Sequence, residues 1–242
     1  MLDTDNMETN LPDRPHGMLR SELELLAELV RSSGAERVLE IGMANASSAV
    51  AILSSLPKSD FAHLTSIDPF QLSPVNPTDG GIGGYGGEGV RQVASAGFAS
   101  KHTLLAELDY VALPKLVAEG ATFDFIFIDG YHSFDHTLLD FFYADRLLKV
   151  GGTVAFHDSA RLPVYKVCTF VATYKPYKMI GPPLALTYRS LAKRILRRAW
   201  FAASGQESAF RQRRERWKSL AAFVKQGDAM APEYELADRA GS

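Results

Sequence analysis

Acidic and imidazole side chains follow two apolar runs that are typical of buried strands. Asp129 and His132 come after the run FDFIFI, and His157 and Asp158 come directly after GGTVAF. Because the carboxyl ends of parallel strands meet at one edge of a sheet, we expect these four side chains to lie close together. A histidine that titrates near neutrality can take a proton from a hydroxyl group, which makes His132 the candidate base. Two carboxylates, on Asp129 and Asp158, are the ligand type that a hard divalent cation such as magnesium prefers.

A third apolar run, RVLEI, ends in a turn of small residues that could approach a ligand. Glu40 lies two positions before Gly42, and Ala44 and Ser48 keep the turn free of large side chains. A carboxylate in this place would repel a pyrophosphate but could hold, directly or through water, the amino-acid end of a cationic ligand. Asp68, at the end of the next predicted strand, can accept both hydrogen bonds of a ribose diol. Since nicotinamide enzymes use the same carboxylate, Asp68 alone leaves the cofactor open.

Strands alternate with amphipathic helices through the first two thirds of the chain. This order predicts βαβ units and an α/β fold, a doubly wound and mostly parallel sheet with helices on both faces. We expect a flexible lead-in over residues 1–16 and a single domain over 17–242. The predicted helices are 18–30, 47–56 and 138–148, and the predicted strands are 37–42, 62–67, 103–106, 123–128 and 152–156, with 219–225 as a candidate last strand.

Two segments interrupt this alternation. Residues 79–90 are rich in glycine, which predicts either a flexible insertion or a lid that closes over a ligand, with Tyr85 as its large side chain. Residues 189–218 are rich in arginine and lysine and predict a basic amphipathic helix within an insertion at about 184–217. That helix either packs its apolar stripe on the sheet or contacts a membrane surface, a second copy in a homo-oligomer, or an acidic partner.

The bulk composition excludes several classes of protein. The net charge of -2 gives no general attraction to nucleic acid or to an anionic membrane, and Cys168, the single cysteine, permits no internal disulfide bond. We find no signal peptide and no run of about 18 apolar residues that could span a bilayer. The expected location is therefore the cytoplasm.

The Glu-x-Gly turn at Glu40 resembles the first motif of Rossmann-type (class I) S-adenosylmethionine-dependent methyltransferases, usually acidic-x-Gly-x-Gly-x-Gly. Ala44 and Ala46 stand here in place of the later glycines. The resemblance implies a seven-stranded sheet and S-adenosylmethionine as cofactor, bound by Glu40, Gly42, Ala44, Ser48, Asp68, Asp109 and Asp129. In this reading Asp68 binds the ribose, and Asp109 lies near the adenine amino group.

The run IDGYHSFDHTLLDFFYADRLLKVGGTVAFHD is similar to the O-methyltransferases that include catechol O-methyltransferase and, more closely, the macrocin-type macrolide-sugar enzymes. The resemblance implies that Asp129 and Asp158 bind a divalent metal and that His132 is the base. Two positions depart from the pattern: Ser159 stands for an asparagine ligand of the catechol enzyme, and His157 for an acidic residue of the macrolide enzymes. His157 would suit a softer metal than magnesium, so a need for metal stays open.

These features together predict an S-adenosylmethionine-dependent O-methyltransferase that acts on a small-molecule hydroxyl, such as that of a sugar, a glycosylated natural product or a phenol. One alternative is an NAD(P)-binding Rossmann oxidoreductase, although the full glycine triplet of that class is missing. A nucleic-acid methyltransferase is disfavoured, because the Asn/Asp-Pro-Pro-aromatic motif is missing and the net charge is near zero. A non-catalytic module that binds the cofactor or a membrane surface is the third alternative.

Overall fold

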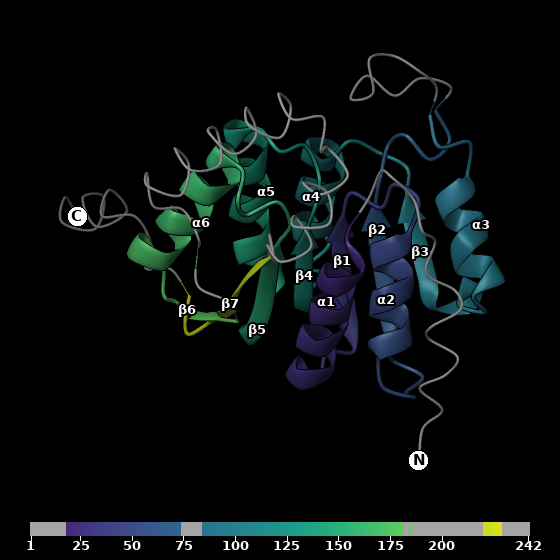
Figure 1. Cartoon of the computed structure of the whole chain (residues 1–242), viewed down its shortest axis with the longest axis horizontal. Coiled ribbons are helices and arrows are strands. Elements are labelled where there is room, and N and C mark those ends of the chain that lie inside the picture. Colours follow the sequence, from purple (N-terminus) through teal and green to yellow (C-terminus); the bar gives the residue numbers. More distant parts are fainter. Residues whose placement is uncertain (1–17, 74–83, 182–183, 185–219, 229–242) are drawn as a thin grey trace, which may run out of the picture.

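Seven strands in the described residues form one sheet, in the order β3-β2-β1-β4-β5-β7-β6 (Figure 1). The computed structural model describes residues 18–73, 84–181, 184 and 220–228. The strands are β1 (Arg37–Ile41), β2 (His63–Ile67), β3 (His102–Leu105), β4 (Phe123–Ile128), β5 (Leu148–Phe156), β6 (Tyr177–Ile180) and β7 (Ala221–Lys225). β7 pairs antiparallel with β5 and β6, and all the other pairs are parallel. The predicted doubly wound, mostly parallel sheet is confirmed.

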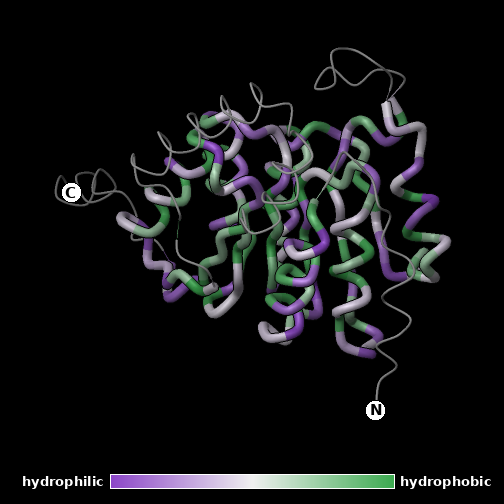
Figure 2. Tube along the Cα trace, in the orientation of Figure 1, coloured by the Kyte–Doolittle hydropathy of each residue, from purple (hydrophilic) through white to green (hydrophobic). Residues whose placement is uncertain are grey.

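Helices cover both faces of the sheet. One apolar cluster packs α1, α2 and α3 on one face, and a second packs α4, α5 and α6 on the other. The helices are α1 (Arg20–Ser33), α2 (Ser47–Ser55), α3 (Glu88–Ser95), α4 (Asp109–Ala118), α5 (Phe134–Leu147) and α6 (Leu162–Tyr174), with a short 3-10 turn η3 (Ala99–Lys101). Hydrophobic residues concentrate along the central strands (Figure 2), as expected for parallel strands buried on both faces.

The helix α5 starts earlier than predicted, and α2 has an unusual N-cap. α5 begins at Phe134, four residues before the predicted start, because the Ser133 hydroxyl accepts a hydrogen bond from the backbone of His136 and caps the helix. α2 begins at the predicted Ser47, but its N-cap is Ala46 and not a serine. The Ser48 hydroxyl turns inward to Glu40 instead.

Some predicted features fall partly or wholly outside the described residues. The lead-in 1–16, the basic helix 189–218 and residues 79–83 of the glycine-rich loop are among them. Glu88, inside the range 79–90 that we gave to that loop, is the first residue of α3. None of the helices in the described part of the chain combines the length and the apolar character that crossing a bilayer requires.

Candidate active site

The carboxyl ends of four parallel strands lie level with one another. Asp129 N donates to Ile41 O (2.8 Å), His157 N donates to Ile128 O (3.0 Å), and Gly42 N donates to Ile67 O (2.9 Å). The ladder therefore continues one residue past β1, β4 and β5. The sheet order reverses between β1 and β4, which is where ligands bind in doubly wound folds. The predicted site residues Gly42, Asp129 and His157 meet at this edge.

The turn after β1 uses left-handed backbone at three alternate positions. The φ angles are 90° at Gly42, 46° at Ala44 and 67° at Ala46. A side chain at Gly42 would collide with the backbone carbonyl of Asp129. The absence of a side chain at this position therefore lets the turn pack directly against the end of β4. The acidic-x-Gly-x-Gly-x-Gly motif, which this turn resembles, has glycine at these three positions. The backbone keeps the left-handed conformation that favours glycine, although two of the residues are alanine.

Asp68 holds this turn from the end of β2. Its carboxylate accepts hydrogen bonds from Met43 N (3.2 Å), Ala44 N (2.7 Å) and Phe70 N (2.8 Å). Gln71, which the sequence did not single out, adds a second link: its side-chain amide donates to the Ala44 carbonyl. The Gln71 amide oxygen accepts from the first turn of α3 at Gly89. Asp68 and Gln71 thus fix the backbone of this turn.

Glu40 is fully buried below the same turn. Its carboxyl oxygens face the hydroxyls of Ser48 (2.5 Å) and Ser66 (2.7 Å), and Ser66 in turn contacts His102 Nε2 (3.0 Å). Burial raises the pKa of Glu40 to about 8, with the nearby carboxylates of Asp129 and Asp68 adding to the rise. Glu40 therefore meets other protein groups directly, and its predicted contact with a ligand would pass through them or through water. Ser66 and His102 had no recognisable pattern in the sequence.

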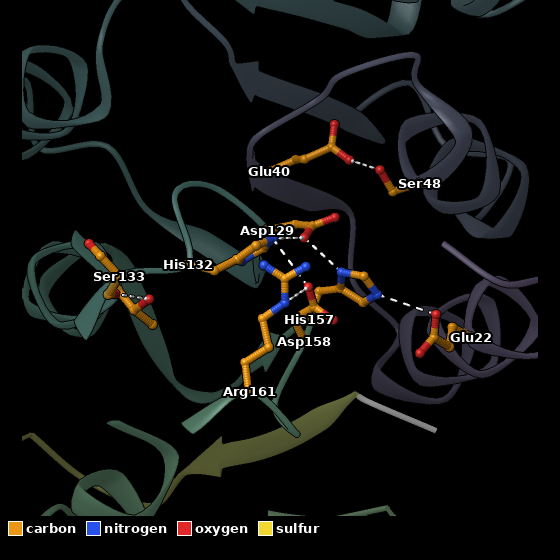
Figure 3. Close-up of polar contacts among 10 residues, drawn as sticks. Glu22, Glu40, Ser48, Asp129, His132, Ser133, His157, Asp158 and Arg161 are labelled. Carbon is orange, nitrogen blue, oxygen red and sulfur yellow. Dashed lines mark hydrogen bonds and ion pairs between the residues drawn. The ribbon is translucent and has the colours of Figure 1, made fainter. Parts of the chain in front are cut away.

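His132 lies between two carboxylates (Figure 3). Its Nε2 is 3.7 Å from Asp129 Oδ1 and 3.4 Å from Asp158 Oδ2, and 25% of its side chain is exposed. Burial lowers the pKa of His132; the two carboxylates oppose this, while Arg161 and His157 reinforce it. With a pKa below its ordinary value, the ring is neutral at neutral pH. A neutral imidazole beside two carboxylates can accept a proton and then has its new charge stabilised.

His157 joins the site to the first helix. Its Nδ1 is 2.8 Å from Asp129 Oδ1, and its Nε2 is 3.3 Å from Glu22 Oε2 on α1 (Figure 3). Burial alone lowers the pKa of His157, but Asp129, Glu22 and Asp158 outweigh burial and hold that pKa well above its usual value. Glu22 was not predicted, although a carboxylate on the apolar face of a helix is an unusual feature that could have indicated it.

The donor atoms at this edge do not suit magnesium, the divalent metal that the sequence left possible. In the described part of the chain, the group whose ligand atoms lie within 4.8 Å of one another is Asp129, His132 and His157, which offers two nitrogens and one oxygen. Magnesium prefers a shell of oxygen atoms. The second expected carboxylate, on Asp158, is not part of this group, and its Oδ2 lies 2.7 Å from Arg161 Nε.

Asp109 lies in a separate contact at the start of α4. Its Oδ2 is 3.5 Å from His136 Nδ1 on α5. The carboxyl oxygens of Asp140 are buried without a hydrogen-bond partner, and burial, reinforced by Asp109, raises the pKa of Asp140 well above its usual range. Asp140 lies against Gly130, just after β4. The predicted contact of Asp109 with adenine stays a prediction.

A doubly wound sheet with polar groups gathered at its switch point defines the class of Rossmann-like α/β enzymes. Residues 39–159, half of the chain, match the family model described as a methyltransferase domain. The chain belongs to this methyltransferase family, and the prediction of a Rossmann-type, S-adenosylmethionine-dependent methyltransferase is confirmed at the level of family and fold. The match includes Glu40, Asp68, Asp129 and His132. No curated protein sequence matches the chain.

Solved structures show the same fold at low sequence identity. A cofactor-bound protein from MTB, Rv0187, has a TM-score of 0.61 at 14% identity, over 91% of this chain and 85% of that one. An O-methyltransferase from Bacillus cereus in complex with SAH has a TM-score of 0.56 at 18% identity, over 73% and 79%. The O-methyltransferase TomG from Streptomyces achromogenes, involved in tomaymycin synthesis and in complex with SAM, has a TM-score of 0.56 at 21% identity, over 72% and 77%.

Proposed function

We propose that this chain transfers the methyl group of S-adenosylmethionine to the hydroxyl of a small molecule, with His132 as the base. The observation that carries the proposal is the position of His132, a mostly buried imidazole between Asp129 and Asp158 at the switch point of the sheet. The names of two structural neighbours, O-methyltransferases bound to SAH and to SAM, support the type of reaction.

The cofactor half of the site is the turn after β1. Gly42 lets the backbone approach closely, and we assign Asp68 to the ribose diol and Asp109 to the adenine amino group. Ala44 and Ser48 complete the turn, and Glu40 lies beneath it. The lack of a Gly-x-Gly-x-x-Gly run after β1 disfavours a dinucleotide pyrophosphate.

The chemical half of the site needs to move one proton. The cofactor supplies a methyl group on a positively charged sulfur, which is already an activated leaving group. His132 removes the proton of the acceptor hydroxyl as the oxygen attacks. Asp158, 3.4 Å from the ring, and Asp129 stabilise the imidazolium that results. The donor set of two nitrogens and one oxygen does not suit magnesium, and the proposed step needs no metal.

Ligand binding tests the cofactor assignment. We expect S-adenosylhomocysteine, and not NAD, to raise the melting temperature of the full chain and to bind with one-to-one stoichiometry in calorimetry. Asp68→Ala should weaken that binding by at least about tenfold, roughly the value of one or two charge-assisted hydrogen bonds. Asp60→Ala, at an exposed aspartate before β2, is the matched control and should leave binding unchanged.

Product formation tests the reaction. Methyl transfer from labelled cofactor to a panel of sugars, glycosides and phenols should give a methyl ether with at least one acceptor. Stabilisation by NAD without stabilisation by S-adenosylhomocysteine would support the oxidoreductase alternative instead. Cofactor binding without turnover on any hydroxylated acceptor would support a binding module.

A further inference from the structure

We propose that Asp140 keeps a proton against Asp109 and thereby positions that carboxylate to select adenine over hypoxanthine in the cofactor. Asp140 is a positioning residue, since it acts through Asp109 and does not itself touch the ligand. Its role rests on the proposed function, in which Asp109 meets the adenine amino group. The proposed reaction leaves this buried side chain otherwise unused.

Asp140 lies at the switch point of the sheet. It belongs to α5, which packs beside α4 (Figure 1), and only 1% of the residue is exposed. A Cβ on Gly130, just after β4, would lie 3.4 Å from Asp140 Oδ2 and 3.3 Å from the side chain of Ile41, the last residue of β1. The carboxyl is therefore buried at the edge where β1 and β4 diverge and where ligands bind in doubly wound folds.

The carboxyl of Asp140 faces another carboxyl and no donor. Within the part of the chain that the structure describes, neither of its oxygens receives a hydrogen bond from a donor group. Its polar neighbour is Asp109. A buried carboxylate without a donor is far more costly than a buried neutral acid. Two carboxyls can form a hydrogen bond with each other only when one of them keeps its proton, so the pair holds one proton between them.

The surroundings of the two residues place this proton on Asp140. The charge of Asp109 is supported, because its Oδ1 accepts from Tyr110 N (2.7 Å) and its Oδ2 lies 3.5 Å from His136 Nδ1. Asp109 is also the first residue of α4, where the helix dipole favours negative charge. Asp140 is the more deeply buried of the two, and burial, reinforced by Asp109, raises its pKa well above the usual range.

A fixed and ionised Asp109 has a consequence for the choice of ligand. His136 and Asp140 lie one helical turn apart on α5, so they hold the Asp109 carboxylate from the same helix. A carboxylate only accepts hydrogen bonds, and it therefore binds the amino group of adenine and repels the carbonyl oxygen of hypoxanthine. Without the Asp140 proton, the carboxylate of Asp109 is free to turn toward His136 and away from the base.

Binding of two purine analogues to the full chain tests this role. We expect S-adenosylhomocysteine to bind at least about tenfold more tightly than S-inosylhomocysteine, as one charge-assisted hydrogen bond implies. Asp140→Asn keeps a donor for Asp109 and should keep this preference. Asp140→Ala removes the donor and should reduce the preference to about threefold or less. Damage to the fold would weaken both ligands alike, so the ratio of the two affinities separates positioning from structure.

Two binding results would overturn the inference. One is a folded Asp140→Ala chain, checked by circular dichroism, that keeps the full preference for adenine. The other is an Asp140→Asn chain that loses the preference as completely as Asp140→Ala does. Asp60→Ala, at an exposed site, is the control and should leave both affinities unchanged. A chain that does not bind S-adenosylhomocysteine at all refutes the proposed function, whereas binding with a ratio that ignores Asp140 refutes only this role.

Infrared spectroscopy detects the proton without a ligand, and it decides the question if Asp140→Ala does not fold. At pH 7 we expect the carbonyl stretch of a protonated carboxyl in the unmodified chain and its loss in Asp140→Asn. Glu40, whose pKa is about 8, contributes a second such band, so the difference between the two chains assigns the signal. An unchanged band in Asp140→Asn would show that Asp140 is ionised and would overturn the inference.

Discussion

The backbone carbonyl of Asp129 occupies the space into which a side chain at Gly42 would project. This contact joins the cofactor turn to the strand that carries the chemical residues, so the two halves of the site are placed by one backbone-to-backbone approach. Because the obstacle is main chain, it cannot rotate away as a side chain could.

Replacing Gly42 by alanine should therefore cost more than ordinary conformational strain. We expect a loss of about 3 kcal/mol or more, from the left-handed backbone and the overpacking together. Gly34→Ala is the matched control, because Gly34 has a φ of 65° but open space around it. It should cost about 1–2 kcal/mol. Urea denaturation of both variants measures the difference, and equal losses would show that the collision is relieved by a small backbone shift.

We predict that glycine at position 44 makes the chain at least as stable as alanine does. Its φ of 46° places an alanine in left-handed backbone. Glycine removes about 1–2 kcal/mol of strain and adds about 0.5–1 kcal/mol of chain entropy to be lost on folding. We expect Ala44→Gly to leave the free energy of unfolding unchanged or raised by up to about 1.5 kcal/mol, the difference of those terms. Ala94→Gly in α3 should lower it by about 1 kcal/mol. Similar losses in both would mean that position 44 is not strained.

Glu40 should make the chain less stable as the pH rises. Its folded-state pKa of about 8 lies above the ordinary 4.5, so its contribution is fully present below pH 4.5 and is lost as the pH rises toward 8. Glu40→Gln keeps polar contacts for Ser48 and Ser66 but cannot ionise. The difference in free energy of unfolding between the original chain and this variant should therefore change across that window. Glu119→Gln, at an exposed site, is the control: its free energy of unfolding should change with pH as that of the original chain does. The same pH dependence in Glu40→Gln as in the original chain would contradict the raised pKa.

Removal of the proposed base should affect turnover and not cofactor affinity. With an acceptor found in the screen, His132→Ala should lower kcat by about 10²–10⁴, the usual value of general base catalysis. Because the pKa of His132 is lowered from 6.5, the acidic limb of the pH–rate profile should lie below pH 6.5. His63→Ala is the control, because His63 begins β2 at the end opposite the site and its ring bonds to Thr103 on β3. Full turnover in His132→Ala would remove the base assignment.

The sequence was sufficient to predict the sheet and the strand ends. Short apolar runs followed by polar residues located β1, β2, β4 and β5, because a parallel strand buried on both faces is apolar along its length. Asp129, His132, His157 and Asp158 could be placed at one edge since the carboxyl ends of parallel strands share it. No such periodicity distinguishes β6, which consists of four residues and is the last strand at one edge of the described sheet.

The partners of these residues could not be predicted in the same way. Glu22 reaches His157 across 135 residues, and such a contact depends on how α1 packs on the sheet and not on spacing along the chain. The hydrogen bonds that Asp68 and Ser48 make within the protein were also missed. A sequence shows that a side chain can accept or donate a hydrogen bond, but it does not show which group is the partner. Arg161, three residues after Asp158, is the partner that local spacing could have indicated.

β7 lies between β5 and β6 although it follows both in the chain. During synthesis β6 therefore has no neighbour in the sheet until residues 221–225 have emerged from the ribosome. Phe156, the last residue of β5 and the one before His157, pairs with Ala221. The reactive edge is thus completed by a late, long-range insertion, a kind of contact that slows folding. Until then, the flank of β5 is an open template on which another nascent chain could dock.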